Sequence, residues 1–570
     1  MKTRSHKQAN HGFSLSLVLV FTGVLFLLLT GLLAWTTTNG NMTQRYNEYY
    51  DTVAAAEAAT EKVVSSMAID FQNSGVNGVD ANLASYGASV PTPGEVSDWG
   101  NYEFDDPSGV PNGTYVTKLT AWQYSDLNWK YSGFKGSNST YRIISNARNT
   151  ASRYGITSAV KQEIQAASIP LFEFGVFYAP DMELCVLLSG FTVSGRVHCN
   201  GTIYCMPNQV TATFLGDVTA AQKILHTNSP ADPSSRTLGT VVYQGEHDWN
   251  VSSLNLPLGI SNNPTNLHAL IDVPPGGEAT NSLTGLQRYY NKADLIILIS
   301  NNTAVAKSGA YNGFATTINW TNITPFVKTN LPAFTDKREN KNIQATEIDL
   351  QQFGSPANYN YLAGALGRNV KILYVADLRS IANTECAVRL INGRTLPAAG
   401  LTVATHNPLY VKGHYNAPDI TPGSTNTSAT FSASLVADAV TILSGAWVDG
   451  NSNNSIGNRK GADTTVNAAV LTGIVPSGGG DFSGGLENVL RLLEDWTSHT
   501  LTYNGSLVVF FPSQIATASW WNDGSVYWPP TRAFSFDTNF KDNTKLPPGT
   551  PWVRTIIRAG WNITQANSTQ

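Results

Sequence analysis

The stretch FSLSLVLVFTGVLFLLLTGLLAW, residues Phe13–Trp35, decides the architecture of this chain. It holds no charged residue over 23 positions, and a helix rising about 1.5 Å per residue over that length crosses the ~30 Å hydrocarbon core of a bilayer. The segment before it carries Lys2, Arg4 and Lys7 and no acidic residue. Because cytoplasmic flanks carry the excess of Lys and Arg, the sequence predicts a single-pass anchor whose large C-terminal part lies outside the cytoplasm.

The apolar segment does not have the sequence pattern of a cleaved secretory signal. Its apolar run is longer than the core of such a signal, and TTTN (residues 36–39) follows it where a small-x-small cleavage motif would stand. We therefore expect the apolar segment to remain in the protein rather than to be removed by signal peptidase.

Length and composition predict an exported, β-rich protein with more than one folded unit. The 570 residues exceed what one hydrophobic core organises, and the 42% hydrophobic fraction excludes global disorder. Charged residues make up 13%, against ~25% in an average soluble domain. The net charge is −4, and no basic tract outside the N-terminus could follow a phosphate backbone. Nucleic acid is therefore not expected as a partner.

The segment after the anchor has the pattern of one face of a helix. No Gly or Pro occurs between Asn41 and Asn73, and apolar or small residues recur at alternating steps of four and three. We expect one continuous helix over residues 13–72, bent at most at Asn39-Gly40, whose second half packs against a sheet. The residues expected in that packing are Tyr46, Tyr49, Val53, Ala56, Val63 and Met67.

The junction Gly12-Phe13, a short basic leader ending in glycine before the apolar run, resembles the class III signal of type IV prepilins. The resemblance implies that a prepilin peptidase cleaves between Gly12 and Phe13 and that the membrane segment, ending near Trp35, takes part in assembly. Most pilins have Glu at the fifth mature position, where this chain has Leu17. That departure is typical of K-type pseudopilins and of PilX-like minor pilins, which cap or initiate a fibre. An ordinary N-terminal anchor is the alternative.

Residues 44–62, QRYNEYYDTVAAAEAATEK, also resemble the signature that follows the membrane helix in PilX-like proteins. The family implies a non-enzymatic minor pilin in the inner membrane, assembled into a type IV pilus-like fibre at the cell surface. Its partners would be other pilin or pseudopilin subunits, the prepilin peptidase and, for an adhesive head, surface glycans. The alternatives are a K-type pseudopilin of a type II secretion system and a membrane-tethered β-helix enzyme acting on polysaccharides.

The chain divides into four expected parts, giving an α+β, mainly β fold. Residues 1–12 are the leader, 13–72 the stalk helix, 73–170 a small antiparallel pilin-like sheet with its preceding loop, and 171–570 a β-rich head. Short strands separated by Gly or Asn favour a parallel β-helix over a sandwich for the head. Within it, Gly485–Trp496 has a helical apolar face and predicts one further helix.

Sequence motifs for catalysis or cofactors are lacking, so we expect no enzyme activity and no cofactor. There is no GxSxG, HExxH, Walker or GxGxxG pattern. One loop has polar residues at the odd positions of a calcium loop but lacks its glycine and its final glutamate, so a polar turn is preferred; these residues are Asp449, Asn451, Asn453 and Ser455. Cys199 and Cys205 are either a disulfide or buried thiols.

Overall fold

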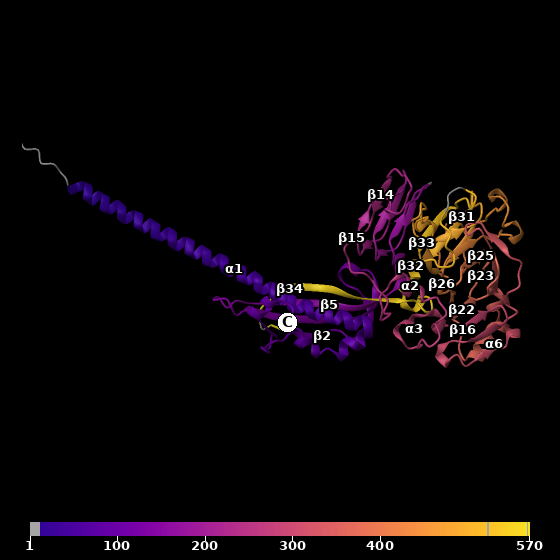
Figure 1. The fold of residues 1–570 in the computed structure, drawn as a ribbon, viewed down its shortest axis with the longest axis horizontal. Coiled ribbons are helices and arrows are strands. Elements are labelled where there is room, and N and C mark those ends of the chain that lie inside the picture. The colour runs from indigo at the N-terminus through magenta and orange to yellow at the C-terminus, as the bar shows by residue number, and fades with distance from the viewer. Residues whose placement is uncertain (1–11, 188, 521–523, 567, 570) are drawn as a thin grey trace, which may run out of the picture.

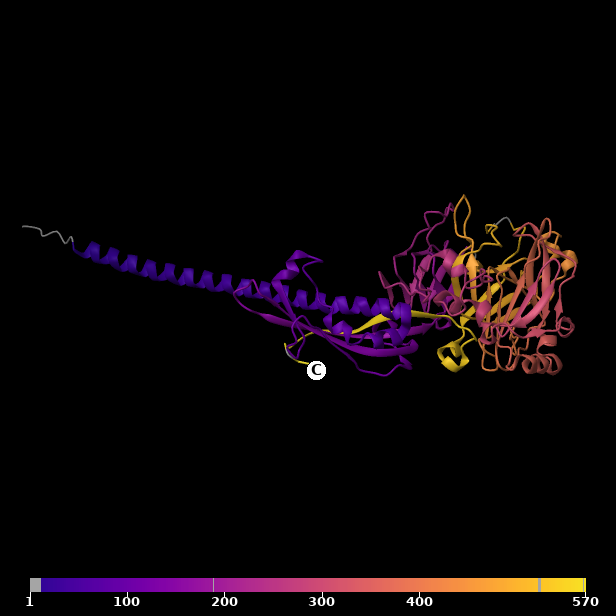
Figure 2. The ribbon, with the colours of Figure 1, turned by 60° about the horizontal axis from the view of Figure 1, so that its bottom comes forward.

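The computed structural model describes residues 12–187, 189–520, 524–566 and 568–569. A long N-terminal helix leads into a small sheet, and a bulky β-rich head lies at the far end of the molecule (Figures 1 and 2). The expected α+β, mainly β fold is confirmed.

The stalk helix α1 (Gly12–Ala81) is longer than its predicted end at Gln72. It continues through Asn39 and Gly40 without interruption, so no break occurs where a bend was allowed. The helical backbone is interrupted at Gly75, whose φ of 65° lies in the left-handed region that glycine adopts without a Cβ penalty. Residues 76–81 then form a further helical turn.

Six antiparallel strands form the sheet that covers the second half of α1. Strand order is β1-β4-β5-β34, and β2 and β3 also pair with β4. The two long central strands are β4 and β5. The bounds are β1 (Tyr102–Asp105), β2 (Tyr115–Lys118), β3 (Gln123–Asp126), β4 (Lys135–Asn149), β5 (Thr157–Pro170) and β34 (Trp552–Thr564).

Two apolar clusters join α1 to this sheet. Of the predicted packing residues, Val53, Ala56, Val63 and Met67 are buried in them and Tyr49 is half-buried. The prediction was wrong for Tyr46, which is 57% exposed, because it lies beyond the end of the sheet. The sheet residues in the two clusters are Phe104, Tyr141, Ile143, Ala147, Val160, Ile164 and Ala166.

The last strand of the chain belongs to this sheet and not to the head. Strand β34 pairs antiparallel with β5 from Trp552 opposite Pro170 to Thr564 opposite Ala159. The division of the chain at residue 170 therefore places β34 in the wrong unit. The head is an insertion between two neighbouring strands, and Figure 1 shows the yellow β34 returning alongside β5.

The first half of the head winds outward from the stalk sheet in successive coils of parallel strands. Each coil contributes one strand to each of three sheets. The strands are β6 (Val176–Tyr178), β9 (Val197–Cys199), β12 (Val218–Ala220) and β15 (His247–Trp249) in the first sheet, β7 (Met182–Leu184), β10 (Ile203–Cys205) and β13 (Ile224–Leu225) in the second, and β8 (Phe191–Val193), β11 (Thr211–Phe214) and β14 (Thr240–Tyr243) in the third.

The chain then crosses to the opposite end of the head and winds back. Three short helices, α2 (Pro264–His268), α3 (Leu283–Gln287) and α4 (Tyr289–Lys292), lie in the crossing segment. At the far end of the head, β17 (Ala304–Ser308) pairs antiparallel with β16 (Leu295–Ile299) on one side and with β18 (Thr317–Ile318) on the other. The returning strands of the first sheet are β22 (Ile372–Asp377), β24 (Leu401–Ala404), β26 (Ala433–Ala437), β29 (Ala469–Ile474) and β32 (Leu507–Pro512).

The two halves meet where β32 pairs in parallel with β6, giving one continuous 12-stranded sheet. A second sheet of the returning half holds β19 (Val327–Lys328), β20 (Phe334–Asp336), β21 (Lys341–Asp349), β23 (Thr384–Ile391), β25 (Leu409–Lys412), β27 (Val440–Leu443) and β30 (Leu490–Leu492). A third holds β28 (Thr464–Asn467), β31 (Thr500–Gly505) and β33 (Thr531–Phe536), and helices α5 (Leu350–Phe353) and α6 (Pro356–Leu366) follow β21.

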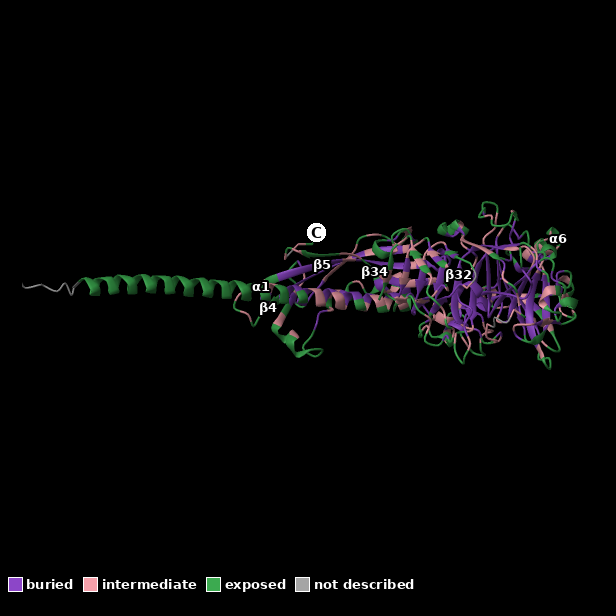
Figure 3. Cartoon of the chain, turned by 90° about the horizontal axis from the view of Figure 1, so that it is seen from above, coloured by how far each residue is buried: buried purple, intermediate pink, exposed green. Residues whose placement is uncertain are grey.

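The helix predicted over Gly485–Trp496 is wrong. Residues 486–488 form one short 3-10 turn and 490–492 form β30. All residues from 486 to 496 are buried, so no solvent-facing side is left for an amphipathic helix. Figure 3 shows this contrast along the molecule: the first half of α1 is exposed, whereas the interior of the head is buried.

Replacing Val53 by Asp should destabilise the packing of α1 on the sheet, because an unpaired carboxylate would enter an apolar cluster. We expect a loss of about 3 kcal/mol in the free energy of unfolding of the unit formed by α1 and the stalk sheet. Thermal unfolding of the full chain in detergent, followed by the fluorescence of its tryptophans, measures it. The control is Ala54→Asp, one position along on the exposed side of the helix. Equal effects of the two substitutions would contradict the packing.

Candidate functional site

The largest uncovered apolar surface is the first half of α1. Among the described residues this is the one helix long and apolar enough to cross a membrane, and its most apolar window has no burial within the protein. Phe13, Leu17 and Trp35 are 78%, 50% and 63% exposed. Exposed apolar surface of this extent indicates contact with lipid or with apolar helices of other chains.

The threonine side chains in this segment are hydrogen-bonded within the helix. Thr22 and Thr30 donate their hydroxyl hydrogens to the carbonyls of Val18 and Phe26, at 2.7 and 2.6 Å. Thr36, Thr37 and Thr38 make the same kind of bond to the preceding turn. Because hydrocarbon offers no hydrogen-bond partners, these internal bonds allow threonine in an apolar environment.

A polar collar holds α1 where it leaves the sheet. The Arg153 guanidinium donates to Asn41 Oδ1 at 2.8 Å and to Gln44 Oε1 at 2.9 Å. Glu48, which is buried, accepts from the Ile156 backbone N–H at 3.1 Å. The turn between β4 and β5 thus fixes the point at which the free helix begins. Sequence analysis missed Glu48, because a single acid in a helix carries no sign of a partner more than a hundred residues away.

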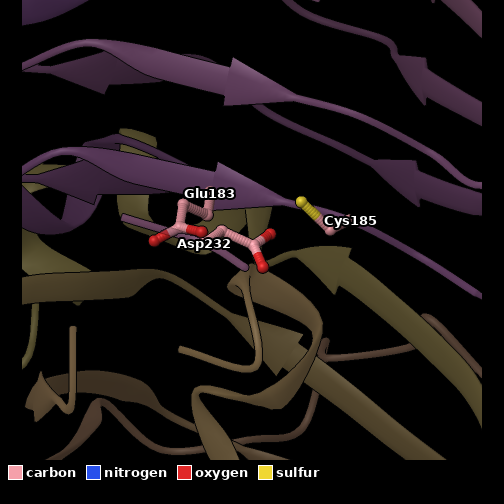
Figure 4. A group of neighbouring side chains, drawn as sticks. All are labelled: Glu183, Cys185 and Asp232. Atoms are coloured by element: carbon pink, nitrogen blue, oxygen red, sulfur yellow. The ribbon is translucent and has the colours of Figure 1, made fainter. Parts of the chain in front are cut away.

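Three side chains in the first half of the head lie close enough to suggest a metal site. The ligand atoms of Glu183, Cys185 and Asp232 are within 4.8 Å of one another, and all three residues are buried (Figure 4). Glu183 and Cys185 come from β7 and the residue following it, and Asp232 comes from the loop before β14. Carboxylate and thiolate ligands are chemically suited to zinc.

The charges of this cluster are already compensated by the protein. Arg236 forms an ion pair with Asp232, and both side chains are almost fully buried. Both Glu183 oxygens accept from Ser477 Oγ, at 2.8 and 2.9 Å, and burial raises the pKa of Glu183. Burial also raises the pKa of the Cys185 thiol, which opposes the thiolate form that a metal requires. The cluster is therefore better explained as a buried ion pair with a neutral thiol beside it.

The predicted weak calcium loop does not assemble. Asp449 Oδ1 accepts from the Arg389 guanidinium at 2.7 Å and from Trp447 Nε1 at 2.8 Å. Asn453 Oδ1 accepts from Lys337 at 2.5 Å, and Asn451 Oδ1 accepts from Asn454. Ser455 Oγ accepts from Asn458. These side chains make separate contacts with the protein.

The cysteines are free thiols in the interior of the head. Cys199 and Cys205 end strands of two different sheets, and no bridge joins them. Cys199 Sγ donates to the Pro180 carbonyl at 3.2 Å. Both lie in the main apolar cluster of the head, so the disulfide prediction is wrong and the buried-thiol alternative holds.

Several buried charged groups of the head are paired with one another. Arg491 and Glu339 are 2.7 Å apart, and Arg389 and Glu347 are 2.8 Å apart. His198 is buried between Thr219 and Asn200, and burial lowers its pKa to about 4. Pairs of this kind have a structural explanation and do not by themselves indicate acid–base chemistry.

His268 connects the crossing segment to the coils. Its Nε2 lies 3.2 Å from Asp438 Oδ1, in the turn between β26 and β27, and its Nδ1 lies 3.0 Å from Asp272 Oδ1. Burial alone would lower the pKa of His268, but the hydrogen bonds and charges of the two carboxylates outweigh it and raise the pKa to about 9. The imidazolium is therefore the form present at neutral pH.

The aromatic residues near the C-terminus are mostly part of the fold. Trp520 packs edge-on against Phe482 with ring centroids 5.5 Å apart, and the Tyr527 hydroxyl contacts Asn488. Trp528 is 41% exposed. Trp521 lies outside the described residues.

Comparisons with known proteins yield one structural likeness. No family model matches the chain, and no curated protein matches its sequence. Among solved structures, the competence-associated pilin ComZ from Thermus thermophilus is similar, with 10% identity over 79% of this chain and 87% of that one and a TM-score of 0.28. A TM-score this low does not support a functional inference.

Stability should depend on pH through His268. A folded-state pKa of about 9 against an unfolded value of about 6.5 means that the stabilisation is complete below pH 6.5 and is lost as pH rises to 9. We expect a loss of about 2–3 kcal/mol in the free energy of unfolding over that range. Denaturant unfolding at pH 6 and pH 9 measures it. His268→Gln should remove only the contribution of this group, so the loss should become smaller by about that amount, whereas His499→Gln, at an exposed ion pair, should leave the loss unchanged.

Proposed function

We propose that the protein is a non-enzymatic, pilin-like structural subunit, anchored in the inner membrane by α1 and assembled into a type IV pilus-like fibre. The observation that carries the proposal is the joint architecture of α1: its first half is an uncovered apolar helix, and its second half packs on an antiparallel sheet. The leader ending at Gly12 and the PilX-like segment at 44–62 add support from the sequence.

Assembly follows from the same surface. In the membrane, lipid covers the apolar half of α1. When the subunit is extracted, neighbouring stalk helices replace the lipid, and close packing of apolar side chains supplies the attraction. The collar around Asn41 and Glu48 fixes the point from which the free helix projects, so the sheet and head stay in a defined position relative to the fibre.

The size of the head and the identity of Leu17, the fifth residue of the mature chain, favour a position at the tip of the fibre or in its initiating complex. The head is wider than the stalk in every view, which disfavours its repetition along a slender fibre (Figures 1 and 2). Leu17 offers no carboxylate with which to dock under a neighbouring subunit. A K-type pseudopilin of a secretion system would share both features. Display of the head outside the cell also fits adhesion.

Processing after Gly12 is the first expectation of this proposal. The mature chain should begin at Phe13, because Gly12 is the glycine at the junction of the basic leader and the apolar run. N-terminal sequencing of the membrane-extracted protein decides this. Gly12→Val should leave the leader attached, whereas Gly23→Val, inside the apolar segment, should be processed normally. A mature protein that retains Met1, or one that begins beyond Trp35, is incompatible with prepilin-type processing.

Replacing Leu17 by Glu should not improve incorporation into fibres. A subunit that initiates or caps needs no carboxylate at this depth, and an unpaired charge there costs about 2–3 kcal/mol of membrane insertion. Immunogold labelling along sheared fibres measures the position of the variant, with Leu17→Ile as the control. If the Glu variant labelled fibres along their whole length, the tip position would be wrong.

A further inference from the structure

A cavity of about 410 Å³ lies at the junction of the stalk sheet and the head. The loop between β2 and β3 contributes Trp122, the end of β5 contributes Ser168, and β34 contributes Trp552 and Arg554. Gln287 and Lys292 come from α3 and α4 of the crossing segment. The volume falls within the range of small-molecule sites.

Positive charge in this cavity has no negative partner. Lys292 and Arg554 are its two charged lining residues, and no carboxylate is present among the described lining residues. Lys292 Nζ lies 5.4 Å from the centroid of the Tyr289 ring and 3.4 Å from Gln287 Oε1, and it forms no ion pair within the described chain. Arg554 Nη1 donates to the Phe71 and Gln72 carbonyls at 3.0 and 2.8 Å, which leaves the rest of its guanidinium for another acceptor.

Burial makes the positive charges of Lys292 and Arg554 less favourable in the folded protein. It lowers the pKa of Lys292 to about 8 and lowers the pKa of Arg554, and no acidic side chain opposes either shift. An anion placed in the cavity would therefore gain charge-assisted hydrogen bonds that the protein itself does not supply. The lining therefore favours a ligand that carries negative charge.

The remaining lining suits a sugar ring. Trp122 and Trp552 are half-buried, and their rings are held by edge-on contacts with Phe71 and Tyr124, at centroid distances of 6.0 and 6.3 Å. Large, positioned aromatic surfaces pack against the C–H faces of a pyranose, and the Gln287 amide and Ser168 hydroxyl can bond its hydroxyl groups.

We propose that this cavity binds a carboxylated pyranose, such as a hexuronate unit of an acidic polysaccharide. The carboxylate pairs with Lys292 and Arg554, and the ring packs between the indoles of Trp122 and Trp552. This assignment goes beyond the structural role proposed above and does not depend on it.

The test uses the full chain in detergent micelles. Saturation-transfer NMR and calorimetry are performed with D-galacturonate and D-glucuronate, and with D-galactose, D-glucose and acetate as comparison ligands. We expect at least one hexuronate to bind with a Kd of about 1 mM, a strength typical of a single sugar. The neutral sugars should bind at least tenfold more weakly, and acetate should not displace the uronate at equal concentration.

The matched variants are Lys292→Gln and Lys307→Gln. Lys307 also lies over aromatic rings, those of Tyr290 and Phe314, but outside the cavity. Lys292→Gln should weaken uronate binding at least fivefold, and Lys307→Gln should leave it unchanged. Equal binding of galactose and galacturonate, full competition by acetate, or no uronate binding to the unaltered chain would each overturn the proposal. These last comparisons need no variant, so they decide the matter even if Lys292→Gln fails to fold.

Discussion

The pairing of β34 with β5 is the constraint on which the rest of the structure depends. The two strands pair antiparallel over their length, from Trp552 opposite Pro170 to Thr564 opposite Ala159. The sheet they complete is the surface on which α1 packs, and Arg554 of β34 also bonds directly to the α1 carbonyls of Phe71 and Gln72. Because both ends of the head attach to adjacent strands, the head is held to the stalk by two connections rather than by one flexible linker.

The order of the coils follows from this attachment. The chain enters the head at β6, an interior strand of the 12-stranded sheet, and its last strand in that sheet is β32, the immediate neighbour of β6. The two halves therefore extend away from a common seam next to the stalk sheet. The crossing segment that joins their far ends runs back along the outside, where His268 connects it to Asp438 in the returning coils. The same segment supplies Lys292 to the cavity at the junction.

Local patterns in the sequence predicted the stalk helix, whereas they could not predict which strands distant in the sequence pair with each other. The apolar run and the four-three spacing located α1, since those signals depend on neighbouring residues. The spacing continued through Tyr46, but burial required a sheet that ends before it. In Gly485–Trp496 the helical pattern misled, because polar residues such as Arg491 and Glu494 are not on a solvent-facing side but are buried and bonded within the head. No local pattern in the sequence predicted the pairing of Trp552 with Pro170. The cavity at the junction could not be predicted either, because its lining residues come from segments far apart in the chain.

The insertion of the head has a consequence for biogenesis. Helix α1 and strands β4 and β5 emerge first during synthesis, yet β5 stays without its outer neighbour until β34 has been synthesised. During that interval β5 is an edge strand with unpaired backbone N–H and C=O groups. Such edge strands can pair with strands of other chains and lead to aggregation. Contacts between residues so distant in sequence also form slowly. A chaperone that shields the growing chain would therefore affect the yield of this protein more than that of a protein whose sheet is built from consecutive strands.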